Sequence, residues 1–313
     1  MPIKSAVESF LSRCIALNLA AGSITWYRHI LKDLAAFLAE SEARELKEVS
    51  PALLRDHLSG LRRRGHASET VFRTYGGIRC AFRFWMREGM IARNPMELVE
   101  RPRRERALIR PMSPEQATRL LDTPDARSWE GVRDRAMMML MLDSGLRISE
   151  VLSLDSGRVD WLNCSAIVMG KGRKERSVPF SARTAQALLE YARARSQRPA
   201  KAAQFFLGRT GKPICRSKMR KLILRYGQQA GIEGVRLSPH TLRHTFAVLY
   251  VRNGGDSFSL QEILGHSTLE MTRQYVNLAR RDVAEQHKKF SPIDVLAGKT
   301  SAASTVTQNY QLV

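Results

Sequence analysis

The segment Ser238–His244 combines residue types that bind phosphate and transfer protons. Ser238 is a favourable helix N-cap and Pro239 suits the first helical position, so His240 falls in the first turn. Arg243 follows three residues later and therefore shares the face of His240. A histidine and an arginine at the positive end of a helix can bind a phosphate group and supply a titratable proton. A capped helix with an exposed arginine and a hydrogen-bonded histidine would also explain the segment, without any chemistry.

A second histidine and a tyrosine flank the start of another predicted helix. His266 directly precedes a capping-box spacing that runs from Ser267 to Glu270, and Tyr275 lies about two turns into the helix. A phenol has a pKa of about 10 in water, so it is a poor nucleophile until nearby cations stabilise its phenolate. A basic pocket would provide those cations. Taken alone, Tyr275 is equally well explained as a core residue of an amphipathic helix.

The segment DSGLRISE, residues 143–150, is predicted to join two helices. Ser144-Gly145 is expected to end the first helix and Ser149 to cap the second, which places Arg147 in the junction. A guanidinium there can point into a cleft, held by a neighbouring carboxylate such as Glu150, and bind phosphate through two hydrogen bonds. An ordinary surface arginine is the alternative interpretation of Arg147.

The charge of the chain favours a polyanionic partner. Among its 313 residues, 51 Lys and Arg outnumber 30 Asp and Glu, which gives a net charge of +21. Neutralising phosphates releases counterions and gives affinity for nucleic acid without regard to sequence, although a merely soluble surface would explain any single basic run. Aromatic residues make up only 7%, which disfavours a single-strand stacking platform and favours duplex DNA. The candidate DNA-binding residues are Arg62, Arg63, Arg64, Arg101, Arg103, Arg104, Arg106, Arg173 and Lys174.

Other classes of protein are disfavoured by the sequence. The longest apolar run, Ala136–Leu142, is far shorter than the roughly 20 residues that span a bilayer, so no membrane association is expected. The N-terminus has no signal-peptide pattern, and the four scattered cysteines disfavour a disulfide framework or a zinc site. We therefore expect a cytoplasmic, nucleoid-associated protein. No P-loop and no acidic set suited to two Mg²⁺ ions occurs, so no metal or other cofactor is expected.

The spacing of apolar residues predicts a mainly α-helical chain of two parts. Helical periodicity over 6–19, 24–38, 52–61 and 71–85 predicts a four-helix module, and the Arg/Pro-rich stretch 101–110 a basic linker. The second part is predicted to be mostly helical, with one small antiparallel β element formed by 166–169 and 175–179. Its expected helices cover 114–121, 130–142, 182–195, 217–230, 239–251, 259–264 and 269–290. We assign domains to 1–100 and 111–290, and a tail to 291–313.

Taken together, these motifs resemble the tyrosine recombinases, the lambda-integrase-like family of site-specific recombinases. The chain contains GLRISE around Arg147, a GKGRKER turn with Lys171, HTLRHTFA with His240 and Arg243, and LGH followed nine residues later by Tyr275. The resemblance covers residues 111–290 and extends loosely to the first hundred, which look like the family's core-binding domain. Agreement among several separately spaced motifs is far more specific than any one of them.

The resemblance implies a mechanism of DNA cleavage without metal or ATP. Tyr275 would attack the scissile phosphate and form a 3′-phosphotyrosyl bond, which frees a 5′-hydroxyl and conserves the bond energy for rejoining. Arg147 and Arg243 would hold the phosphate, and His266 would donate a hydrogen bond to it.

The remaining roles follow from the same resemblance. Lys171 would protonate the leaving 5′ oxygen; Lys174 lies in the same turn, but the family pattern favours the lysine of Gly-Lys-Gly. His240 would act as general base or acid toward the tyrosine, and Glu150 would position the site.

The resemblance also implies partners. Four protomers would act on two specific double-stranded DNA sites, with accessory DNA-binding factors possible, and residues 276–290 with the tail are candidates for exchange between neighbours. Both parts of each chain would clamp the duplex. The sequence after Tyr275 favours integration or excision of a mobile element, and Xer-type resolution of chromosome or plasmid dimers is the alternative. A type IB topoisomerase and a non-catalytic architectural DNA-binding protein are alternatives from other classes.

Overall fold

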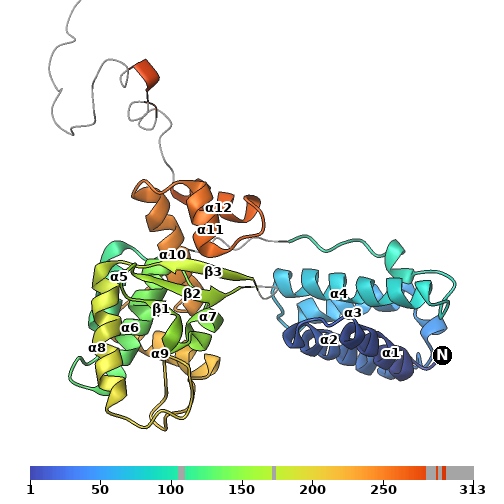
Figure 1. Ribbon diagram of the computed structural model, residues 1–313. Coiled ribbons are helices and arrows are strands. Elements are labelled where there is room, and N and C mark those ends of the chain that lie inside the picture. Colours follow the sequence, from blue (N-terminus) through green and yellow to red (C-terminus); the bar gives the residue numbers. More distant parts are fainter. Residues whose placement is uncertain (105–109, 171–173, 280–286, 288–290, 294–313) are drawn as a thin grey trace, which may run out of the picture. The chain divides into compact units, whose positions relative to one another are not determined.

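The chain divides into two compact units, Met1–Leu108 and Ile109–Val313. The computed structural model describes residues 1–104, 110–170, 174–279, 287 and 291–293 (Figure 1). Three of the predicted functional residues, Arg106, Lys171 and Arg173, lie outside the described residues, as does most of the proposed exchange segment and tail.

The first unit contains the four predicted helices. They are α1 (Ile3–Ala16), α2 (Ala21–Glu40), α3 (Pro51–Arg63) and α4 (Ser68–Arg87), with short 3₁₀ turns at Leu46–Glu48 and Pro95–Leu98. Ser50 accepts the Leu53 N–H and Pro51 opens α3, as the sequence predicts. The fully buried Trp85 packs edge-on against Phe82 and donates its indole N–H to the Ala6 carbonyl over 2.8 Å.

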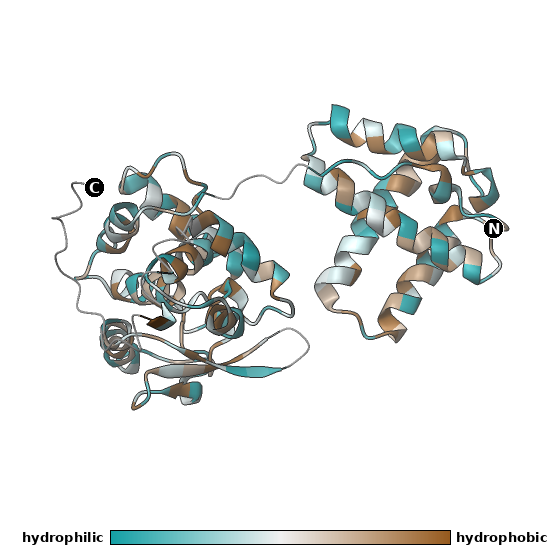
Figure 2. Cartoon of the chain, turned by 90° about the horizontal axis from the view of Figure 1, so that it is seen from above, coloured by the Kyte–Doolittle hydropathy of each residue, from teal (hydrophilic) through white to brown (hydrophobic). Residues whose placement is uncertain are grey.

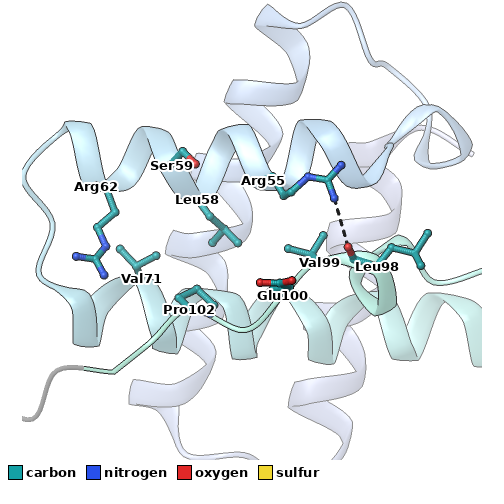
Figure 3. Close-up of a pocket in the computed structure, with 9 residues that line it drawn as sticks. All are labelled: Arg55, Leu58, Ser59, Arg62, Val71, Leu98, Val99, Glu100 and Pro102. Atoms are coloured by element: carbon teal, nitrogen blue, oxygen red, sulfur yellow. Dashed lines mark hydrogen bonds between the residues drawn. The ribbon is translucent and has the colours of Figure 1, made fainter.

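The segment that begins at the end of the last 3₁₀ turn of the first unit is hydrogen-bonded to both α3 and α4. Arg55 of α3 donates to the Leu98 carbonyl over 3.3 Å, and Tyr75 of α4 donates to the Val99 carbonyl over 3.0 Å. Figure 3 shows the pocket beside this segment, with Arg55 and Arg62 of α3 on one side and the chain from Leu98 to Pro102 on the other. The start of the predicted linker is therefore packed against the helical module.

The second unit is mostly helical with a small antiparallel sheet. Its helices are α5 (Pro114–Asp122), α6 (Trp129–Ser144), α7 (Ile148–Ser153), α8 (Ala182–Ser196), α9 (Arg216–Gln229), α10 (Pro239–Arg252), α11 (Ser257–Leu264) and α12 (Glu270–Ala279). The sheet has the order β1 (Val159–Asp160), β2 (Ser165–Met169), β3 (Glu175–Pro179). The predicted β2–β3 pairing is present, with Val168 opposite Arg176, while the two-residue β1 was missed because it is too short for a pattern.

Two local predictions for the second unit need correction. The helix after Arg147 begins at Ile148, so Arg147 rather than Ser149 is its N-cap. Helix α12 begins at Glu270, so Ser267 is not its N-cap and the capping box predicted from Ser267 to Glu270 is wrong. The part of the predicted helix beyond Ala279 lies mostly outside the described residues. The caps predicted at Ser113 and Ser238 are present: Ser113 forms a capping box with Gln116, and Ser238 accepts the Thr241 N–H.

The core of the second unit forms around α6. Its apolar run includes the buried residues Ala136, Met137, Met138, Leu140 and Met141, and the helix packs against α8 and α10. A smaller apolar cluster joins α10, α11 and α12 and includes Phe246, Leu264 and Tyr275. Figure 2 shows polar and apolar residues mixed along the helices of both units, as expected of amphipathic helices. Within the described ranges, no helix is both long enough and apolar enough to cross a membrane.

A buried ion pair ties α6 to its surroundings. Arg133 and Asp134 are each 1% exposed, and two guanidinium nitrogens of Arg133 donate to Asp134 Oδ1 over 2.8 and 2.6 Å. Arg133 also donates to the Leu207 carbonyl, and Tyr226 of α9 donates to Asp134 Oδ2 over 2.9 Å. Burial raises the pKa of Asp134, against the opposing effect of Arg133.

We predict that Arg133→Met destabilises the chain by about 3–5 kcal/mol, because it leaves the Asp134 carboxylate buried without a cation. A carboxyl with a raised pKa contributes stability at low pH that is lost as pH rises. The deficit relative to the wild type should therefore shrink as pH falls, measured by urea unfolding across a pH series. A deficit independent of pH would contradict this account.

Candidate active site

The guanidinium of Arg243 is buried among the ends of two other helices. Arg243 is 5% exposed, one turn into α10. Its Nη1 donates to the Gly145 carbonyl at the end of α6 over 2.6 Å, and its Nη2 donates to the Leu264 carbonyl at the end of α11 over 2.8 Å. Carbonyls at helix C-termini carry partial negative charge and suit a cation. Burial, and then the charge of Arg147, lower the pKa of Arg243 to about 10, so it stays charged at neutral pH.

Glycines end both of these helices in the left-handed region. Gly145 has φ +62° and Gly265 has φ +60°. A Cβ on Gly145 would lie 2.3 Å from the Phe246 ring, and one on Gly265 would lie 3.1 Å from the Arg176 guanidinium. The two glycines therefore allow α6 and α11 to end close to the arginines.

Arg147 is held by Glu150 at the start of α7. Its backbone N–H donates to Glu150 Oε2 over 2.8 Å and its Nη1 donates to Oε1 over 3.0 Å. Nη2 lies 3.5 Å from the Gly265 carbonyl. The side chain of Arg147 remains 30% exposed while that of Glu150 is 4% exposed. The neighbouring carboxylate expected from the sequence is thus in place, and it leaves part of the guanidinium open to a ligand.

Arg176 is a site residue that sequence reasoning missed. It lies on β3, where Nη1 and Nη2 donate to the two Glu150 oxygens over 2.9 and 3.0 Å and Nε donates to the Ile263 carbonyl over 3.0 Å. Burial raises the pKa of Glu150, but the hydrogen bonds from Arg176 and Arg147 outweigh it and hold the pKa below its usual value. Strand alternation was the available signal, because Arg176 lies two residues before the buried Val178 and on the same face.

His266 and Tyr275 lie beside Arg243. His266 Nε2 is 3.1 Å from Arg243 Nη2, and its Nδ1 is 3.0 Å from Thr272 Oγ1. The Tyr275 ring stacks on that of His266 with centroids 6.1 Å apart and lies 5.4 Å from the ring of His244. Tyr275 is only 2% exposed, and burial raises its pKa while Arg243 opposes the shift.

Three histidines of the site are neutral at neutral pH. Burial, followed by the charge of Arg243, lowers the pKa of His266 to about 4, and burial followed by His240 lowers that of His244 to about 4. His240 is exposed in the first turn of α10, where partial desolvation and then Arg243 and Arg147 lower its pKa. His244 was missed by sequence reasoning, although it lies one turn after His240.

The predicted residues are only partly brought together. Arg147, Glu150, Arg243, His266 and Tyr275 converge, with His240 beside them, whereas Lys171 lies outside the described residues. Lys174 is exposed, and its carbonyl accepts the Gly170 N–H over 2.8 Å beside the paired ends of β2 and β3. In the described part of the chain, no group of three or more His, Cys, Asp or Glu side chains could hold a metal ion.

The described DNA-binding candidates in the first unit are all exposed, and two of them form ion pairs with acidic side chains. Arg64 donates to Asp33 over 2.9 Å, and Arg104 forms an ion pair with Glu69. The guanidiniums of Arg101 and Arg104 lie over the Phe72 ring. The exposed set comprises Arg62, Arg63, Arg64, Arg101, Arg103 and Arg104.

Comparison with known proteins identifies the family. Residues 110–281 match the phage integrase family. The chain is 30% identical over 294 residues to tyrosine recombinase XerD of Staphylococcus haemolyticus, which covers 93% of this chain and 99% of the relative. The chain therefore belongs to the phage integrase family. It is a tyrosine recombinase, an enzyme that breaks and rejoins DNA strands.

Solved structures share this fold at lower identity. The XerH site-specific recombinase bound to palindromic difH substrate superposes with a TM-score of 0.73 at 20% identity, over 92% of this chain and 84% of that one. The Tn1549 transposon integrase in complex with a circular intermediate DNA superposes with a TM-score of 0.69 at 20% identity, over 92% of this chain and 99% of that one. Both agree with the mainly helical architecture described above.

We predict that Arg176→Gln slows DNA cleavage by about tenfold or more, because charged hydrogen bonds that orient Glu150, and through it Arg147, are lost. Arg158→Gln is the matched control. It also removes an ion pair between an arginine and β3, but this pair, with Glu175, is exposed. Rates of covalent capture of a nicked suicide duplex, measured beside DNA affinity, check this. Equal slowing by both substitutions would contradict a positioning role for Arg176.

Proposed function

We propose that this chain is a site-specific recombinase that cuts and rejoins duplex DNA through a 3′-phosphotyrosyl link to Tyr275. The observation that carries the proposal is the convergence of two guanidiniums, an imidazole and a phenol from four separate segments. Phosphodiester cleavage needs positive charge at the non-bridging oxygens, a nucleophile, and an acid for the leaving oxygen. The described residues offer the first two of these.

Arg243 and Arg147 bind the scissile phosphate in this proposal. Backbone carbonyls accept from two of the five N–H groups of Arg243, which leaves three for phosphate oxygens, one of them the N–H that contacts His266 in the resting site. Arg147 adds a partly exposed guanidinium fixed by Glu150. Because both cations are held before DNA arrives, little reorganisation is needed when negative charge develops in the transition state.

Tyr275 attacks the phosphorus, so the phenolic oxygen–phosphorus bond forms as the bond to the 5′ oxygen breaks. Since its side chain is 2% exposed and its pKa is raised, the resting tyrosine is a neutral phenol packed in the core. We propose that α12 shifts on DNA binding to expose it. His240, exposed and neutral in the first turn of α10, accepts the phenolic proton, and Lys171 gives a proton to the leaving 5′ oxygen.

The proposed assembly is four protomers on two double-stranded DNA sites in the cytoplasm, associated with the nucleoid. Domains 1–100 and 111–290 would clamp the duplex, joined by the basic linker 101–110, and residues after Tyr275 would pass to a neighbour. The excess of basic over acidic residues supports DNA binding that weakens steeply with salt.

The proposed role is integration or excision of a mobile element. The fold shared with the Tn1549 transposon integrase over 99% of that chain is compatible with this role. Resolution of chromosome or plasmid dimers is the second candidate, favoured by 30% identity over 99% of XerD. The two roles differ in where the DNA sequences that the protein cleaves lie in the genome. Sites at the two ends of a mobile element that carries the gene for this chain would support the first role. A single site in the chromosome would support the second.

We predict that Tyr275→Phe binds DNA as the wild type does but forms no covalent adduct. The measurement is capture from a library of nicked suicide duplexes with random sequences, which also reveals the target site. Wild-type protein should retain a defined sequence, whereas retention without sequence preference would point to a topoisomerase. Adduct formation by the variant would refute the assignment of the nucleophile.

We predict that Lys171→Ala slows cleavage of normal DNA but spares a substrate with a 5′-bridging sulfur, because a thiolate leaves without an acid. Lys174→Ala is the control from the same turn and should behave like the wild type on both substrates. If Lys171→Ala were equally slow on both, or if only Lys174→Ala showed the selective defect, Lys171 would not be the general acid.

A further inference from the structure

Both ring nitrogens of His266 have polar neighbours, and one of these fixes the position of the proton. Arg243 Nη2 lies 3.1 Å from Nε2, and Thr272 Oγ1 lies 3.0 Å from Nδ1. An arginine can only donate hydrogen bonds, so Nε2 must accept and carries no hydrogen. The hydrogen of the neutral ring is therefore on Nδ1 and is donated to the hydroxyl oxygen of Thr272.

This resting tautomer is the wrong one for the proposed reaction. A hydrogen bond from His266 to a phosphoryl oxygen would have to come from Nε2, since Nδ1 is turned to the fully buried Thr272. With Nε2 lacking a hydrogen, the ring cannot make that bond until its protons are rearranged.

We infer that Thr272 is a positioning residue whose hydroxyl reverses from acceptor to donor when phosphate binds and thereby switches the tautomer of His266. The inference rests on the proposed phosphate contact of His266. Phosphate takes the Arg243 N–H away from Nε2, which then gains a proton from water while Nδ1 releases one to water. The ring stays neutral, no net proton is taken up, and Thr272 now donates to Nδ1.

The surroundings of His266 favour exchange of tautomers over a second proton. Arg243 and His244 face the ring from α10, Arg147 from the junction before α7, and Arg176 from β3, so a positive imidazolium would be repelled. Tyr275 covers the ring from α12. The pKa of about 4 agrees with a ring that stays neutral.

A hydroxyl at position 272 meets both requirements. A threonine hydroxyl can accept from Nδ1–H in one state and donate to bare Nδ1 in the other, whereas an aliphatic side chain does neither. Thr272 is 0% exposed, so its polar group is buried against this one histidine rather than solvated. It also lies one turn before Tyr275 on α12, so the group that sets the tautomer and the nucleophile share a helix.

The resting tautomer can be tested in the full-length free protein by NMR with ¹⁵N-labelled histidines, the His266 signals being assigned by their loss in His266→Asn. We expect a protonated Nδ1 and an unprotonated Nε2, and the reverse pattern at saturating inorganic phosphate. A resting Nε2–H ring, a resting imidazolium, or a pattern unchanged by phosphate would each overturn the inference. Because no DNA is cleaved, these outcomes are independent of whether Tyr275 is the nucleophile.

Two substitutions test the hydroxyl itself. Thr272→Val keeps the shape and removes the hydroxyl, and it should slow covalent capture by about ten- to a hundredfold, the usual effect of an unsatisfied buried group, with DNA affinity unchanged. Thr272→Ser keeps the hydroxyl and should stay within about threefold of the wild type. Equal rates for the two variants would overturn the inference, and the NMR measurement on unaltered protein decides it if Thr272→Val does not fold.

Discussion

The burial of one positive charge organises the candidate active site in the second unit. The Arg243 guanidinium lies almost out of contact with water, and backbone carbonyls from the ends of α6 and α11 replace its hydration. Burying a cation costs free energy unless its N–H groups are hydrogen-bonded. The stability of this arrangement therefore requires α6 and α11 to end where the Gly145 and Leu264 carbonyls reach the guanidinium. Gly145 and Gly265 provide the left-handed turns that make this possible. The resulting arrangement also places His266 and Tyr275, which follow α11.

A second constraint is the imbalance of charge around Glu150. One buried carboxylate neutralises part of the charge of Arg147 and Arg176, while Arg243 is held only by carbonyls and an imidazole. The unbalanced positive charge contributes to keeping the histidines neutral. A DNA phosphate would supply the missing negative charge. This imbalance supports the proposal that a phosphate of the DNA substrate completes the site, which agrees with membership of a family that breaks and rejoins DNA.

Sequence patterns predicted most of the elements and part of the site. The helix caps at Ser238 and Gly145 are local signals, and they placed His240 and the end of α6 correctly. Arg176 and Thr272 were missed because their roles depend on contacts between segments far apart in the sequence or on the direction of a side chain. The interpretation of Tyr275 as a core residue is confirmed, since its ring belongs to an apolar cluster, while its role as the nucleophile stays a prediction.

We propose that Arg243 and Arg147 together hold the phosphate that Tyr275 attacks. The most direct measurement is a crystal structure of the covalent complex with a captured suicide duplex. We expect both guanidiniums to lie within hydrogen-bonding distance of the non-bridging oxygens of the phosphotyrosine, with Arg243 still bound to the Gly145 and Leu264 carbonyls. A phosphate joined to a different side chain, with Tyr275 still packed in the apolar cluster, would contradict it.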